Sequence, residues 1–250
     1  METNVGPGRT AADMDLEAVV FDTGGTVLDW HTGVMGGFAS AGQRVGVTAD
    51  WATLANTWRR LSTDHVKRVT LENAGRMQQD MDDVLRSTLD ATLGEHGVRG
   101  LGDEYDSLVR SWRHSPAWPD ASPGIRLLRD RYIVAAFTIL RTSLVIEASK
   151  RSGVQWDAVF SCEMTGIYKT ASPAYTNTAR WLDLHPSRIL LAATHNNDIS
   201  AARANGYRTA YIYRPLEWGD TPSADPEPGV DAELVAQDIV DLAAQLDSGQ

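Results

Sequence analysis

Four polar side chains with complementary chemistry follow apolar segments of this chain: Asp22, Thr138, Lys169 and Asp198. A lysine beside a carboxylate lowers the pKa of that carboxylate and keeps it ionised. An ionised carboxylate can act as a nucleophile and form a covalent ester, and a second carboxylate can orient or deprotonate the water that cleaves the ester. An isolated Asp after a strand is more often a turn cap. These residue types therefore predict covalent catalysis by Asp22 only if folding brings them together.

The elements that must position these side chains alternate between strand and helix patterns. Short apolar runs that end in glycine or polar residues are typical of buried parallel strands, and we expect strands at 16–21, 132–137, 156–161, 188–193 and 208–213. Helical patterns separate the last four of these runs. This alternation predicts an α/β fold with a doubly wound, Rossmann-like parallel sheet covered by helices on both faces. Ligands bind at the carboxyl ends of such strands, where the four polar residues would meet.

A long helical block interrupts the sheet pattern after the first strand. Between residues 30 and 116, apolar residues recur every three or four positions, as in 51–69, 77–93 and 105–112, and no convincing strand pattern is present. We therefore predict an inserted α-helical cap domain at 30–116 and a Rossmann-like core domain formed by 16–29 and 117–250. Residues 1–15 are expected to be a flexible N-terminal tail, and residues 215–229 a long surface loop.

Composition excludes several classes of protein. The 250 residues are 42% hydrophobic and 22% charged, which is typical of a globular protein. With 23 Lys and Arg against 33 Asp and Glu, the net charge of −10 disfavours binding to nucleic acid or to an anionic membrane. The single Cys162 excludes an internal disulfide. Because no spanning segment or signal peptide is recognisable, we expect a cytoplasmic protein without membrane partners. An anionic substrate would have to be held by a few local cations.

The polar motifs and their order resemble those of the haloacid dehalogenase superfamily. The resemblance rests on Phe21-Asp22-Thr23-Gly24-Gly25-Thr26-Val27-Leu28-Asp29-Trp30, Thr138, Tyr168-Lys169 and Ala193-Thr194-His195-Asn196-Asn197-Asp198, and it extends from Leu16 to Leu246. It is strongest to the (S)-2-haloacid dehalogenase (type II) family. This implies a hydrolase that acts on small anionic 2-halocarboxylic acids, needs no cofactor and no metal, and forms a homodimer as many relatives do.

The resemblance also implies a role for individual residues. Asp22 would displace halide with inversion and form an ester that water hydrolyses to the 2-hydroxy acid. Lys169 would keep Asp22 ionised, and Asp198 would help to position the water. Residues implied to bind substrate or halide are Thr23, Gly24, Thr26, Arg59, Thr138, Ile139, Tyr175, His195 and Asn196. Arg59 would stabilise the halide, although Arg60 is an alternative, while Tyr175 and His195 have purely structural interpretations as well.

Three positions depart from the motifs of the family. Gly24 replaces the second Asp of the related phosphatases, whose side chain is the general acid and whose backbone binds Mg²⁺, so phosphate-ester hydrolysis is disfavoured. In the dehalogenases an aromatic residue usually stands at Gly24 and an Asn at Ile139, and a proline usually stands at Thr170. These changes predict a larger and more apolar site than a haloacetate requires.

Other functions are compatible with the same residues. The Asp22 nucleophile could act on a larger natural-product intermediate by displacing another leaving group, by cyclisation or by rearrangement. A non-catalytic binding module would have no need to retain Asp22, Lys169 and Asp198 together. Turnover of a phosphate ester that depends on Mg²⁺ would instead indicate a phosphatase.

Overall fold

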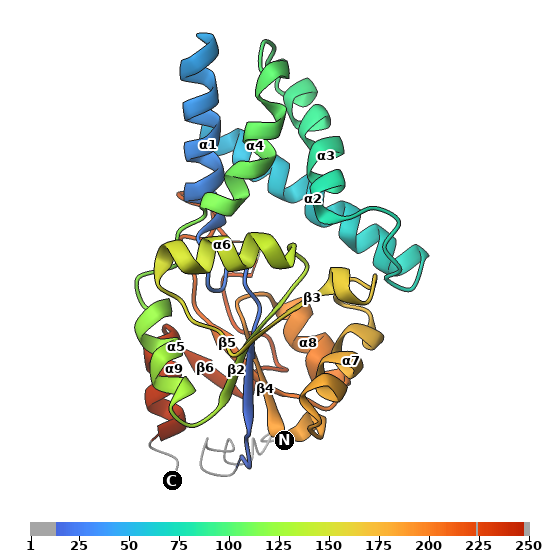
Figure 1. Cartoon of the computed structure of the whole chain (residues 1–250), viewed down its shortest axis with the longest axis vertical. Helices are drawn as coiled ribbons and strands as arrows, with labels where there is room; N and C mark the ends of the chain where they lie inside the picture. The colour runs from blue at the N-terminus through green and yellow to red at the C-terminus, as the bar shows by residue number, and fades with distance from the viewer. Residues whose placement is uncertain (1–13, 224, 248–250) are drawn as a thin grey trace, which may run out of the picture.

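A parallel sheet of six strands forms the centre of the structure, a computed structural model that describes residues 14–223 and 225–247. The strand order is β3-β2-β1-β4-β5-β6 (Figure 1). The strands are β1 (Ala18–Phe21), β2 (Ile133–Thr138), β3 (Ala158–Ser161), β4 (Ile189–Ala193), β5 (Arg208–Ile212) and β6 (Leu234–Ala236). The doubly wound fold is thus confirmed, and five strands lie within two residues of their predicted bounds. The three-residue edge strand β6 was not predicted, because it is too short to carry a recognisable pattern.

Side chains of each strand alternate between two helical layers. In β1, Val19 and Phe21 pack with one layer, and Ala18 and Val20 pack with the other. The first layer contains α5 (Ala121–Arg129) and α9 (Ile239–Asp247), and the second contains α7 (Ser172–Leu182) and α8 (Asn196–Ala204) (Figure 1). Helix α5 was not predicted, because Pro123 suggested a boundary. A proline is nevertheless tolerated in the first turn of a helix, where its missing N–H has no partner to lose.

The segment 30–116 is helical, as predicted. It contains α1 (Trp30–Val45), α2 (Trp51–Glu72), α3 (Met81–Glu95) and α4 (Tyr105–Ser111). Asp29, Asp50 and Asp80 cap the first three of these helices, and each side chain accepts a backbone N–H from the first turn. The helix expected from Met77 therefore begins later, after the Asp80 cap, while the Met77 N–H donates to Gly166 O at 2.7 Å.

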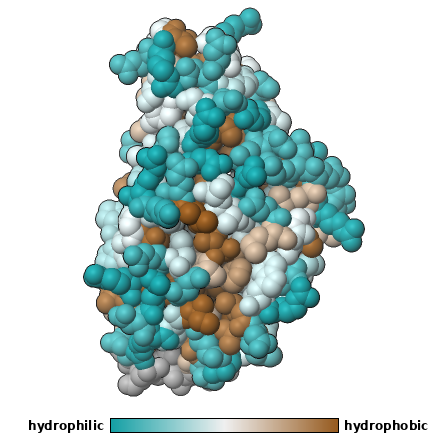
Figure 2. All heavy atoms as spheres, viewed as in Figure 1, coloured by the Kyte–Doolittle hydropathy of each residue, from teal (hydrophilic) through white to brown (hydrophobic). Residues whose placement is uncertain are grey.

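Helices α1 to α4 gather beyond one end of the sheet (Figure 1). Their buried side chains, including Phe38, Trp58 and Trp112, form one cluster with Leu144 and Val145 of α6 (Thr142–Ser152). On the face seen in Figure 2, hydrophilic residues cover most of this end of the molecule, and apolar residues gather below it. We keep 30–116 as cap and 16–29 with 117–250 as core as our proposed domain division; most of the predicted tail, 1–13, lies outside the described residues.

The order of the strands reverses between β1 and β4. After β1, the chain adds β2 and β3 on one side and then returns to place β4, β5 and β6 on the other. Phe21 at the end of β1 is in register with Ala136 of β2 and with Ala192 of β4. The residues that follow these strands consequently meet at the switch point, where an open α/β sheet binds its ligands. In the described part of the chain, every helix is too short or too polar to cross a bilayer.

Candidate active site

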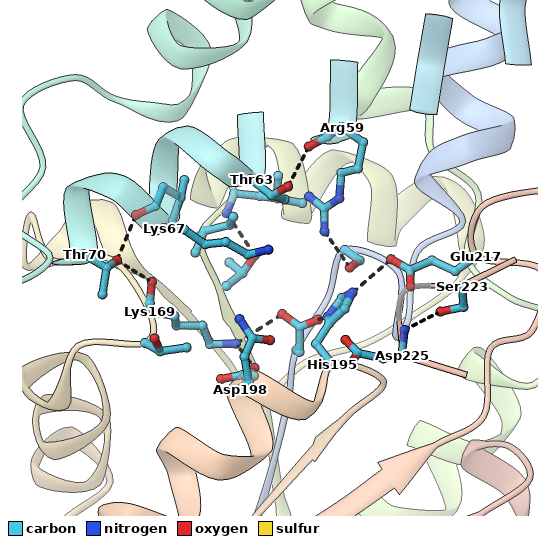
Figure 3. A pocket seen from close by; sticks show the side chains of 18 of the residues that line it. Arg59, Thr63, Lys67, Thr70, Lys169, His195, Asp198, Glu217, Ser223 and Asp225 are labelled. Atoms are coloured by element: carbon cyan, nitrogen blue, oxygen red, sulfur yellow. Dashed lines mark hydrogen bonds and ion pairs between the residues drawn. The ribbon is translucent and has the colours of Figure 1, made fainter. Parts of the chain in front are cut away.

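A cavity of about 560 Å³ lies between helix α2 and the carboxyl edge of the sheet. Figure 3 shows Arg59, Thr63, Lys67 and Thr70 on the α2 side, opposite Lys169, His195 and Asp198 of the core. The loop after β5 adds a third wall through Glu217, Trp218, Ser223 and Asp225. The cavity is therefore enclosed by segments that are far apart in the sequence.

Asp22 lies on the floor of this cavity, directly after β1. Its Oδ1 accepts a hydrogen bond from Lys169 Nζ at 3.1 Å, and its Oδ2 lies 3.1 Å from both Thr26 Oγ1 and His195 Nδ1. Burial by itself would raise the pKa of Asp22, but the charge of Lys169 and the hydrogen bond with His195 outweigh it. The pKa of Asp22 is thereby held well below its usual range, so the carboxylate is ionised at neutral pH.

Lys169 bridges two carboxylates. Besides Asp22, its Nζ donates to Asp198 Oδ2 at 2.7 Å and to the Phe137 carbonyl oxygen at 2.7 Å. Burial would lower the pKa of this lysine, but the charges of Asp198 and Asp22 raise it. The lysine is thus a fixed cation whose three N–H donors are all used.

Asp198 is held from the side opposite the cavity. It lies in the first turn of α8, and its Oδ1 accepts a hydrogen bond from Tyr175 Oη at 2.5 Å. Burial raises the pKa of Asp198, even though Lys169 acts in the opposite direction. Tyr175 itself is fully buried and does not line the cavity. Its position suits orientation of Asp198 better than the direct contact with substrate that the resemblance implied.

His195 connects Asp22 to a carboxylate that the sequence analysis missed. Its Nε2 lies 2.9 Å from Glu217 Oε1, which also accepts a hydrogen bond from Trp30 Nε1 at 3.0 Å. Burial would lower the pKa of His195, but the charge of Glu217 and the hydrogen bond with Asp22 raise it to about 10. His195 is therefore the second cation in contact with Asp22.

Glu217 corrects the prediction that residues 215–229 are only a surface loop. Its side chain is 1% exposed and lines the cavity, although neighbouring Leu216 is 60% exposed. Burial would raise the pKa of Glu217, yet the charge of His195 lowers it. The available signal was its place shortly after the predicted strand at 208–213, because residues that follow a parallel strand lie at the ligand-binding edge.

Arg59 enters the cavity from α2 as a buried cation that forms no ion pair within 4 Å among the described residues, although the charges of Glu217 and Asp22 act on it. Its guanidinium carbon lies 5.5 Å from the centroid of the Trp30 ring and 5.9 Å from that of Trp112, and Nη2 donates to Gly24 O at 3.3 Å. Nε and Nη1 are buried without a hydrogen-bond partner among the described residues. A buried cation with unsatisfied donors favours binding of an anion. The alternative, Arg60, points outward and pairs with Glu95 at 3.2 Å.

The remaining predicted binding residues divide into two groups. Gly24, Thr138, Ile139 and His195 line the cavity, as do Asp22, Arg59, Lys169 and Asp198. The second group does not line the cavity, and its side chains form hydrogen bonds with other protein groups. It consists of Thr23, Thr26, Tyr175 and Asn196. Thr23 Oγ1 donates to Thr138 Oγ1 at 2.6 Å, and Asn196 Nδ2 donates to Glu227 O at 2.9 Å. The neighbouring Asn197 lines the cavity instead of Asn196, because consecutive helical residues point in different directions.

The backbone beside Asp22 offers donors as well. The N–H groups of Thr23 and Gly24 have no hydrogen-bond partner within 14–223 and 225–247. They lie in the turn that immediately follows Asp22, next to the side chain of Thr138. Free backbone N–H groups in a tight turn suit an anionic oxygen. A carboxylate bound here would lie beside Asp22.

Comparison with known proteins agrees with this geometry. The chain is 26% identical over 213 residues to (S)-2-haloacid dehalogenase 1 of Pseudomonas sp. (strain CBS-3). The match covers 83% of this chain and 90% of the relative. Among solved structures, an L-2-haloacid dehalogenase matches with a TM-score of 0.84 and 32% identity, over 92% of this chain and 99% of the other. A defluorinating L-2-haloacid dehalogenase matches with a TM-score of 0.87 and 35% identity, over 97% of this chain and 100% of the other. No family model matches.

The chain belongs to the L-2-haloacid dehalogenases. Within this family, Gly24 was expected to leave open space where an aromatic residue usually stands. A Cβ atom at Gly24 would lie in ordinary van der Waals contact, 3.5 Å from Leu140 Cδ1 and 3.6 Å from Arg59 Nη2. Gly24 itself lines the cavity, so the roomier site stays a prediction. The apolar character expected from Ile139 is present, since Ile139 and Leu140 both line the cavity.

The site of this L-2-haloacid dehalogenase does not suit a divalent metal ion. Lys169 Nζ lies between Asp22 and Asp198, where a bridging cation would compete with it. The carbonyl of Gly24, whose counterpart in the related phosphatases binds Mg²⁺, accepts a hydrogen bond from Arg59. Within the described residues, no group of three or more His, Cys, Asp or Glu side chains is placed to hold a metal. The donor set thus disfavours a metal-dependent phosphatase.

Proposed function

We propose that this L-2-haloacid dehalogenase hydrolyses (S)-2-halocarboxylic acids through a covalent ester on Asp22. The observation that carries the proposal is the pairing of an ionised Asp22, 3.1 Å from Lys169 Nζ, with the unpaired guanidinium of Arg59 in the same cavity. A nucleophile and an anion site in one cavity suit displacement of a halide. A halide leaves without a proton, so no general acid is needed at Gly24.

The first step forms the ester. A carboxylate oxygen of Asp22 attacks carbon 2 of the substrate, the carbon–halogen bond breaks, and the halide leaves with the bonding electrons toward Arg59. Thr138 and the free N–H groups of Thr23 and Gly24 bind the substrate carboxylate beside Asp22. Attack from the side opposite the halogen inverts carbon 2. The enzyme supplies orientation and charge stabilisation, which together account for large rate enhancements.

The second step hydrolyses the ester. Water attacks the carboxyl carbon of Asp22, which releases the 2-hydroxy acid and restores the carboxylate. Asp198, on the cavity wall, helps to position this water. Esterification removes the charge of Asp22 and so weakens the effect that raises the pKa of His195. The charge of Glu217 still raises this pKa, so His195 stays protonated. Asp198 accepts the proton from the attacking water and then releases it to solvent. The balance is halocarboxylate plus water to hydroxycarboxylate, halide and one proton.

Turnover in ¹⁸O-labelled water tests the ester directly. Over many cycles with (S)-2-chloropropionate, the proteolytic peptide that contains Asp22 should gain mass, and the peptide that contains Asp198 should not. In a single turnover, the product should carry unlabelled oxygen that comes from Asp22. Label in the product of that single turnover would show direct attack by water and would overturn the proposal.

Two further expectations, on oligomeric state and on cellular location, belong to the same proposal. We keep the homodimer and the cytoplasmic location implied by the family resemblance as proposals. Sedimentation of the purified protein tests the first, and fractionation of cells that express it tests the second.

A further inference from the structure

Lys67 is a cation in the cavity that the proposed reaction does not use. It lies on α2, lines the cavity, and its side chain points into the cavity in Figure 3. Its nearest carboxylate partner, Asp64 Oδ1, is 4.0 Å away, and the Lys67 side chain is 64% exposed. A contact of this length between two exposed side chains contributes little energy. The ammonium group of Lys67 is therefore available to a ligand.

The other cations in the cavity already contact Asp22 or other protein groups close to it. Lys169 donates to Asp22, Asp198 and Phe137 O, and His195 lies between Asp22 and Glu217. Arg59 is buried beside two tryptophan rings, at the proposed halide position. Lys67 differs from these residues because it is exposed and lies toward the opening of the cavity.

The distance between Arg59 and Lys67 indicates what kind of ligand reaches both. They are eight positions apart on α2, which corresponds to about 12 Å along a helix axis. Both side chains lean toward the N-terminus of the same helix, so this lean leaves the distance along the axis unchanged. Thr63 and Val66 lie between them on α2, and Ile139 and Leu140 of the core also line the cavity. The apolar members of this lining, in a cavity that holds both cations, match a molecule with a short methylene chain and an anionic group at its far end.

We propose that Lys67 binds the distal carboxylate of a 2-halodicarboxylic acid whose methylene chain lies against Val66, Ile139 and Leu140. This inference rests on the proposed dehalogenation by Asp22. A cavity of about 560 Å³ has room for such a chain, whereas a halopropionate fills only part of it. The net charge of −10 repels a dianion more than a monoanion, so a preference for the dianion has to come from a local cation.

Two substrates of equal chain length test the proposal: (S)-2-bromopentanedioate and (S)-2-bromopentanoate. Bromide release by the wild-type enzyme should give a kcat/KM about tenfold higher for the dicarboxylate, the size expected of a charge-assisted contact of about 1.4 kcal/mol. Lys67→Met should abolish this preference, chiefly through KM, and should leave kcat/KM for the monocarboxylate within about twofold. The matched control Arg68→Met removes an exposed cation from the next position of α2 and should retain the preference.

The possible failures are distinguishable. Equal kcat/KM values for the two substrates in the wild-type enzyme, or a preference that survives Lys67→Met, would overturn the role of Lys67 and leave the dehalogenase proposal intact. Loss of the preference in Arg68→Met as well would show an effect of net charge and would also overturn it. Failure to release bromide from either substrate would overturn the proposed function and this inference together.

Discussion

The Nζ atom of Lys169 lies 3.1 Å from Asp22 Oδ1, although 147 positions separate the two residues in the chain. Asp22 comes at the end of the central strand β1, and Lys169 comes from the loop between β3 and α7. The same ammonium group contacts Asp198, which follows β4. One cation thus connects segments that follow three strands of the sheet. It keeps Asp22, the proposed nucleophile, charged in a site where burial would otherwise favour the protonated carboxyl group.

Replacement of Lys169 by Met should destabilise the protein and abolish its activity. It leaves Asp198 buried without its cation and leaves His195 as the cation in contact with Asp22. Removal of one partner of a buried ion pair typically costs about 3–5 kcal/mol of unfolding free energy. Urea unfolding at pH 7 measures this loss, and Lys150→Met, at an exposed position of α6, is the matched control. Part of the loss should be recovered at acidic pH, where one carboxyl group of the variant is protonated. Unchanged halide release in Lys169→Met would exclude the proposed role of this lysine.

Arg59 and Arg60 should respond very differently to the same substitution. Arg59→Lys removes the planar guanidinium beside the Trp30 and Trp112 rings. We expect kcat/KM for (S)-2-chloropropionate to fall about 10²-fold, because a lysine ammonium does not present the same planar set of N–H donors to the departing halide. Arg60→Lys retains a charge in an exposed pair with Glu95 and should change kcat/KM by less than about twofold. Steady-state chloride release measures both. Similar losses in the two variants would contradict the assignment of Arg59 to the halide.

The pKa of His195 should fall when Glu217 is neutralised. In the folded protein this pKa is raised from 6.5 to about 10, so protonation of His195 favours the folded state. The resulting stabilisation is fully present below about pH 6.5 and is lost as the pH rises through about 10. Titration of the imidazole by NMR should give a pKa near 10 in the wild-type protein and a clearly lower value in Glu217→Gln.

Denaturation provides a second measure of the same pair. Between pH 7 and pH 10.5, the wild-type protein should lose at least ~2 kcal/mol of unfolding free energy that Glu217→Gln does not lose. Glu227→Gln, in the same loop but not on the cavity, serves as the control. An imidazole that titrates near 6.5 in the wild-type protein would exclude the ion pair.

Tyr175→Phe tests whether Asp198 needs to be held from behind. The variant removes the hydroxyl that donates to Asp198 Oδ1 and keeps the ring that packs edge-on against Phe137. Loss of a hydrogen bond to a buried charged group should cost about 1–3 kcal/mol of unfolding free energy. If Tyr175 positions Asp198 for ester hydrolysis, kcat should fall about tenfold with little change in KM, and the ester on Asp22 should accumulate. Unchanged kcat with reduced stability would indicate a purely structural role.

Much of the active site was predictable because strand ends carry a strong signal. The apolar run before Asp22, the glycines after it and the alternation of strands and helices predicted where Asp22, Lys169 and Asp198 would meet. Helix starts were less predictable: α3 begins at Met81 because Asp80 caps it, and α5 begins before Pro123. Tertiary contacts and local capping determine such boundaries, and apolar periodicity does not report them.

The amino-acid sequence by itself determined the order of the elements, the proposed nucleophile with its lysine, and the family, because residue type and spacing along the chain encode all of these. Only the tertiary structure decided which side chains reach the cavity. In the folded chain Glu217 contacts His195, and Tyr175 donates to Asp198 from outside the cavity. Arg59 and Asn197 line the cavity, whereas their neighbours Arg60 and Asn196 do not. These outcomes depend on the direction in which each Cα–Cβ bond points after the cap and the sheet have packed together. Neighbouring residues of identical type differ in that direction, so sequence alone does not distinguish them.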